Sequence, residues 1–141
     1  MNKIIVLLLV FSTLVSLFGC GAMETSDYLS ETGVVFYPQT ILKNEDAATL
    51  RAKSMQALID SFIRFRWDIH SIDKDAGKMT AEACRRGKHC MEVEATIKDD
   101  GTVEIIRTPG QTITRNEGTA LKGWITNLKT YYDRLLIESL K

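Results

Sequence analysis

The sequence predicts a two-layer α+β domain, with an antiparallel sheet of three to four strands and two helices on one face. Three observations predict this fold. Apolar residues recur at intervals of three and four in two segments, 50–65 and 121–140, as in amphipathic helices. Between them, apolar residues alternate with polar ones, as in strands covered on one side only. The expected order is therefore α-β-β-β-α, in one domain over 45–141.

The first helix is expected to begin near Asn44-Glu45-Asp46, where a capping residue precedes acidic residues. Its predicted apolar face is formed by Leu50, Met55, Leu58, Ile59, Phe62 and Ile63. Upstream, Val34–Tyr37 predicts a short edge strand, which Pro38 would end.

The strands follow at Trp67, where the apolar period changes to two. Trp67, Ile69 and Ser71 are expected on one face, and Asp68, His70 and Ile72 on the other. Later strands are predicted at 79–84, 90–97 and 102–108, separated by turns that include Asp73–Gly77 and Asp99–Gly101. Thr112–Thr114 is a possible further piece of edge.

The closing helix has the longest apolar stripe, about five turns, and Asn116-Glu117 is its expected start. The stripe consists of Leu121, Trp124, Ile125, Leu128, Tyr131, Tyr132, Leu135, Leu136 and Leu140. Burying it against the sheet would stabilise the fold by about 25 cal/mol per Å² of apolar surface.

The N-terminus has the features of a secretory leader. Lys3 is followed by the apolar run Ile4–Phe18, which is too short for a transmembrane helix, and then by Leu17-Phe18-Gly19-Cys20. This end resembles the lipobox of bacterial lipoproteins. The resemblance implies a signal peptide over 1–19, an acylated Cys20 that holds the chain on a bilayer, and a tether over 20–44. Gly21, where inner-membrane lipoproteins often have Asp, implies the periplasmic face of the outer membrane.

The charge balance argues against a nucleic-acid partner. The chain has 18 basic and 18 acidic residues, and loss of Lys3 with the leader leaves 17 against 18, a net charge of −1. Nucleic-acid binders usually carry a strongly basic face.

Two cysteines remain besides Cys20. Folding the hairpin so that paired residue numbers sum to 174 places Cys84 opposite Cys90, which predicts a disulfide in an oxidising compartment. The alternative is a metal or redox site that uses Cys84 and Cys90 with His89. Met91 would not join it, because the alternation turns Met91 toward the core. The spacing is also not that of a Cys-x-x-Cys redox motif.

The tip of this hairpin is basic. Arg85, Arg86, Lys88 and His89 form either a solvated turn or a contact for lipid phosphates, lipopolysaccharide or an acidic partner. Elsewhere, His70 and the acidic residues Glu82, Glu92 and Glu94 are better explained by an exposed sheet face than by acid–base chemistry. No nucleophile motif or phosphate loop is present in the sequence, so no enzyme, metal or cofactor is predicted.

Four segments are similar to a family of small bacterial envelope lipoproteins: Phe65-Arg66-Trp67, Gly77–Ala81, Val93–Ile106 and Trp124–Leu128. The family usually has Tyr-Asn before the closing Trp, where this chain has Leu121-Lys122-Gly123. The resemblance implies the fold and the envelope location, and no activity. The leading hypothesis is a non-enzymatic binding or assembly module with an envelope protein partner, bound through its exposed sheet face or an edge strand.

Overall fold

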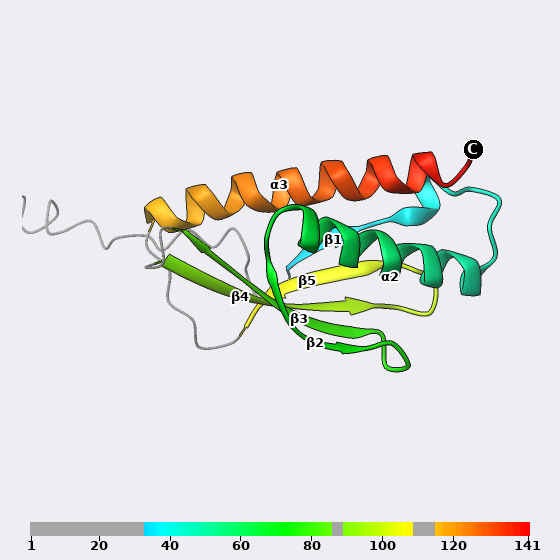
Figure 1. The fold of residues 1–141 in the computed structure, drawn as a ribbon. Helices are drawn as coiled ribbons and strands as arrows, with labels where there is room; N and C mark the ends of the chain where they lie inside the picture. Colours follow the sequence, from blue (N-terminus) through cyan, green and yellow to red (C-terminus); the bar gives the residue numbers. More distant parts are fainter. Residues whose placement is uncertain (1–32, 86–88, 109–114) are drawn as a thin grey trace, which may run out of the picture.

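Two helices lie on one face of a five-stranded antiparallel sheet in the computed structural model, which describes residues 33–85, 89–108 and 115–141 (Figure 1). The α+β class is therefore confirmed, with five strands in place of the expected three or four. In chain order the elements are β1 (Val34–Phe36), a 3₁₀ turn (Pro38–Thr40), α2 (Ala47–Arg64), β2 (Asp68–Asp73), β3 (Lys78–Arg85), β4 (His89–Ile97), β5 (Val103–Arg107) and α3 (Arg115–Glu138).

The fifth strand is the edge strand β1, which lies where the short edge strand over Val34–Tyr37 was expected and ends before Pro38. The strand order is β1-β5-β4-β3-β2, and Val34 pairs with Ile105 while Phe36 pairs with Val103. Phe36 and Leu42, which follows the 3₁₀ turn, are both fully buried in the common core. Residues 33–44 therefore pack as part of the folded domain.

The other edge strand, β2, contains a bulge that corrects the predicted alternation. Ile69 pairs with Ala81 and Ser71 pairs with Thr80, so the register shifts at His70. After the shift, the residues of β2 exchange between the two faces of the sheet. Ile72 therefore pairs with the buried Met79 and does not share a face with Asp68, contrary to the strict alternation that was predicted. Ile72 still remains 40% exposed at this edge.

The β3–β4 hairpin has the expected register and faces, and the β4–β5 hairpin forms at the expected turn. Ala81 pairs with Val93, and both side chains are fully buried. The turn between β4 and β5 depends on Gly101, whose φ is +83°; an added Cβ would lie 2.8 Å from the backbone of Leu50 in α2. Only glycine therefore lets this turn pack against the helix. Residues 109–114, including the possible strand at 112–114, lie outside the described residues.

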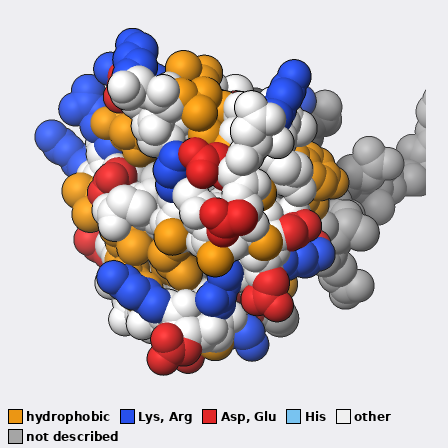
Figure 2. Space-filling model, turned by 90° about the vertical axis from the view of Figure 1, so that its right-hand side faces the viewer, with side chains coloured by type: hydrophobic (Ala, Val, Ile, Leu, Met, Phe, Trp, Pro, Cys, Tyr) orange, Lys and Arg blue, Asp and Glu red, His pale blue; other side chains and the backbone are white. Residues whose placement is uncertain are grey.

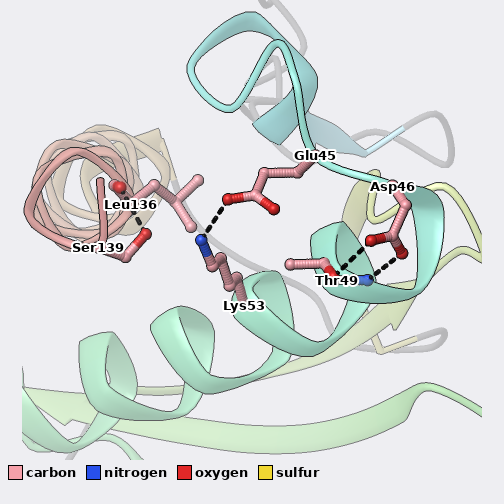
Figure 3. A network of polar contacts seen from close by, with 6 residues as sticks. All are labelled: Glu45, Asp46, Thr49, Lys53, Leu136 and Ser139. Carbon is pink, nitrogen blue, oxygen red and sulfur yellow. Dashed lines mark hydrogen bonds and ion pairs between the residues drawn. The ribbon is translucent and has the colours of Figure 1, made fainter. Parts of the chain in front are cut away.

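Helix α2 begins two residues later than its first capping candidate implies. The N-cap is Asp46 and not Asn44, and Asp46 accepts a hydrogen bond of 2.9 Å from the backbone N–H of Thr49. Glu45 instead pairs with Lys53 at 2.6 Å, beside Leu136 and Ser139 near the C-terminal end of α3 (Figure 3). The ion pair thus joins the segment before α2 to the second turn of the helix.

The buried face of α2 differs from the predicted one in its smaller residues. Leu50, Met55, Leu58 and Phe62 are buried as expected, but Ile63 is 62% exposed. Ser54, Ala57 and Ser61 are buried in its place. These small side chains permit close packing, and the buried Tyr132 of α3 donates a hydrogen bond of 2.9 Å to Ser54 Oγ.

The buried face of α3 follows the predicted stripe over most of its length. Ile125, Leu128, Tyr132 and Leu136 are buried. Leu140 is 56% exposed, because the helix ends at Glu138 before reaching it. The helix starts at Arg115, next to the expected start. Within the described ranges, no helix has the length and apolar character to cross a membrane.

Candidate functional site

The predicted cysteine pair lies at one end of the sheet. Cys84 on β3 faces Cys90 on β4, with Cα atoms 4.0 Å apart and sulfur atoms 2.03 Å apart, a disulfide distance. Both residues are exposed. Met91 is buried, as the alternation predicts.

A carboxylate lies beside this pair. One oxygen of Glu82 and the sulfur atoms of Cys84 and Cys90 lie within 4.8 Å of one another, and this is the only group of three such ligands among the described residues. Glu82 also pairs with His70 across the two strands, at 3.6 Å. Sulfur atoms bonded to each other do not offer the thiolates that zinc or copper requires, so the closed pair is a cross-link.

The other predicted site residues are only partly described. Arg85 and His89 pair at the ends of β3 and β4, and their side chains lie outside the described set. Arg86 and Lys88, like the lipidation residue Cys20, also lie outside it. The basic tip therefore stays a prediction.

A groove of about 410 Å³ lies next to the disulfide, where α2 ends and α3 continues over the sheet (Figure 1). It is lined by Phe65, Arg66, Trp67, Ala83, Cys84, Trp124 and Asn127. The rings of Trp67 and Trp124 meet edge to face, with centroids 6.3 Å apart. The groove thus combines aromatic surface with the donors of an arginine and an amide, a combination that suits a ligand with apolar and polar parts.

The end of α2 determines how the groove is lined. The N–H of Trp67 donates to the carbonyl of Phe62 at 2.9 Å, and that of Arg66 to the carbonyl of Ile63 at 3.1 Å. These two bonds form a Schellman motif, completed by the contact between the rings of Trp67 and Phe62 at 5.2 Å. The motif requires a left-handed residue, and Arg66, with φ of +58°, occupies the position where glycine is usual.

Sequence reasoning did not identify this groove as a site. In the sequence, Phe65-Arg66-Trp67 and Trp124–Leu128 carry only a resemblance to other lipoproteins, and that resemblance concerns the fold. The structure brings both segments together on one groove, 57 residues apart in sequence from Trp67 to Trp124. The one signal in the sequence was that both segments belong to the resemblance to envelope lipoproteins.

A second groove, of about 510 Å³, lies at the opposite end of the sheet, beside Arg51 and Lys74. Arg51 donates to the carbonyl of Asp75 at 2.6 Å, and its Nε lies 3.9 Å from Asp99. One side chain thus joins α2 to both turns, a structural role. The view onto the end that holds the C-terminus shows acidic and basic side chains interspersed (Figure 2).

Among the described residues, no ionisable group with an altered pKa lines either groove. Burial raises the pKa of Tyr132 far above its ordinary value of 10.0, so its hydroxyl stays protonated and bonded to Ser54. Hydrogen bonds from Thr102 lower the pKa of Asp100 in the β4–β5 turn. These shifts accompany structural hydrogen bonds in the core and at a turn.

No protein-family model matches the chain, and no curated protein matches it. We therefore infer function from the residues of this chain alone.

Proposed function

We propose that this protein is a lipid-anchored, non-enzymatic binding or assembly module of the bacterial cell envelope, held on a bilayer through Cys20. The observation that carries the proposal is the motif Leu17-Phe18-Gly19-Cys20 at the end of the apolar run that begins at Ile4. Two or three acyl chains make a firm anchor without a transmembrane helix. The periplasmic face of the outer membrane is the location we propose, because Gly21 follows the acylated residue.

The binding part of the proposal is supported by the groove beside the disulfide. Its aromatic walls are available to an apolar group, and Arg66 and Asn127 supply donors at its rim. Asn127 is exposed, so a partner can reach it without rearrangement of the core. We therefore place the contact with an envelope protein here, in addition to the open sheet face and the edge strands.

The anchor is tested by the intact mass of the protein purified from its native membrane. The expected mass is that of a chain beginning at Cys20 with a diacylglyceryl group, and usually an additional acyl chain. Cys20→Ala is the control and should leave the chain uncleaved and without lipid. An unmodified chain cleaved elsewhere would refute the lipid anchor.

The groove is tested by photocrosslinking in cells. A photoreactive residue at Asn127 should give a discrete protein adduct. The same residue at Thr126, which is exposed but about 100° around the helix, should not. Equal crosslinking from both positions, or none from either, would contradict binding at the groove.

The alternative is a periplasmic metal- or redox-handling protein that uses Cys84 and Cys90 with His89. The observation that favours it is the carboxylate of Glu82 within 4.8 Å of both sulfur atoms. Reduction by a periplasmic thiol donor would add two electrons and two protons to the disulfide, and a metal ion would then displace the protons. Stoichiometric zinc or copper on the reduced protein, lost in Cys84→Ser/Cys90→Ser, would favour this function. No bound metal would exclude it.

A further inference from the structure

We propose that the corner at the end of α2 rests on the anionic surface of the bilayer that holds the anchor. This α2 corner consists of Ile63, Arg64, Phe65 and Arg66. The inference rests on the proposed lipid anchor and adds the orientation of the domain: the end with the groove faces the membrane.

The α2 corner alternates exposed apolar and cationic side chains. Ile63 is 62% exposed and Phe65 is 38% exposed, while Arg64 and Arg66 are both exposed. A surface that presents apolar side chains beside arginines fits the boundary between lipid headgroups and acyl chains. Each arginine near an anionic bilayer strengthens binding roughly fivefold.

Among the residues that the structure describes, neither arginine of the corner has a carboxylate partner. Arg64 lies over the ring of Tyr131 at 6.0 Å, and neither it nor Arg66 forms an ion pair with any described residue. Lys53 and Arg134, by contrast, pair with Glu45 and Glu138. The positive charge of the corner is thus available to lipid phosphates.

The path of the chain brings this corner toward the membrane. β1 begins beside Ile105 and runs toward Val103, whereas β5 runs toward the disulfide end. β1 is antiparallel to β5, so it begins at the disulfide end of the sheet and runs away from it. The chain therefore enters the sheet at the end where the disulfide and the α2 corner lie. Cys20–Thr32 comprises thirteen residues, which span at most about 45 Å fully extended. The corner is then confined close to the bilayer.

The tryptophans provide a built-in reporter for this contact. The chain has two, Trp67 and Trp124, and both line the groove next to the corner. The acylated full-length mature protein is reconstituted in vesicles that contain a headgroup spin-labelled lipid, with phosphatidylcholine alone or mixed with phosphatidylglycerol. We expect at least twofold stronger quenching of tryptophan emission in the mixed vesicles, weakening as salt is added.

Matched variants separate the corner from the rest of the surface. Arg64→Gln/Arg66→Gln should reduce the quenching to its level in phosphatidylcholine, and Ile63→Ser should reduce it in both vesicles. The charge control is Lys74→Gln/Lys78→Gln, which changes two exposed lysines near the opposite end of the sheet. The apolar control is Ile137→Ser, at a residue 52% exposed. Far-UV circular dichroism confirms that each variant is folded.

The outcomes distinguish this inference from the proposed anchor. If the mass shows an acylated Cys20 but quenching is equal in both vesicles, or falls equally in the control variants, the docking is overturned and the anchor stands. If the chain carries no lipid, the proposed function fails first. A photoreactive residue at Ile63, which belongs to the corner but does not line the groove, tests the docking apart from the groove. Capture of protein instead of lipid at this position in native membranes would also overturn the docking, in favour of a protein partner.

Discussion

Replacing Arg66 with glycine is expected to stabilise the domain. Arg66 holds the left-handed position of the Schellman motif, with φ of +58°. For a residue with a Cβ this conformation costs about 1–2 kcal/mol. Glycine removes that cost but adds about 0.5–1 kcal/mol of backbone entropy in the unfolded chain. The net gain for Arg66→Gly is about 0.5–1 kcal/mol, or a rise in Tm of a few degrees.

Urea unfolding of Arg66→Gly and Arg66→Ala tests this estimate. Alanine also removes the guanidinium but keeps the Cβ, so Arg66→Ala should remain within about 0.5 kcal/mol of the unsubstituted protein. Both variants should lose vesicle contact to the same extent, since both lack the charge. If Arg66→Gly is no more stable than Arg66→Ala, the backbone at this position is not strained and the reasoning fails.

Three further measurements test other contacts. Tyr132→Phe should lower the free energy of unfolding by about 1–2 kcal/mol and Ser54→Ala by about 1 kcal/mol. In the double variant the two losses should overlap by about 1 kcal/mol, which urea unfolding measures. Additive losses would contradict a direct hydrogen bond. Reducing the Cys84–Cys90 bond should lower the free energy of unfolding by about 2 kcal/mol, because the closed loop is short; an unchanged urea midpoint would show that the cross-link adds no stability. The lowered pKa of Asp100 gives stability that is present above pH 3.8 and is lost as the pH falls below it. Asp100→Asn should therefore show a shallower fall in Tm below that pH, and superimposed profiles would refute the effect.

The central hairpin was predictable because several local signals agree. Alternation alone assigned Val93 to the core, and the facing cysteines fixed the register at a pairing sum of 174. A slip of one residue would have moved every apolar side chain to the open face. The next hairpin, β4–β5, had a signal of its own in the turn at Asp99–Gly101, whose glycine supplies the positive φ that the chain requires there.

The features that were not predicted depend on contacts between distant parts of the chain. β1 lies where a short edge strand was predicted, but its partner was not: it has three residues and pairs with β5, some 70 positions later, so no local pattern indicates the pairing. The bulge at His70 shifts the period by one residue within a six-residue strand, too short to reveal the change. Asp46 rather than Asn44 became the cap because its carboxylate meets both the N–H and the hydroxyl of Thr49.

The groove arises from the unequal lengths of the two helices, which no motif encodes. α3 has 24 residues and α2 has 18, or about 36 Å against about 27 Å. α2 ends at Arg64, so the end of the β3–β4 hairpin receives less helix cover than the rest of the sheet. The Cys84–Cys90 bond lies at this end, next to the buried pair of Ala83 and Met91, and cross-links the two strands there. Because α2 does not extend over this end of the sheet, a cross-link between the two strands is useful there for stability. For the same reason, Trp67 and Trp124 border an open groove. The need for the cross-link and the proposed binding site therefore have one physical origin, the shorter helix.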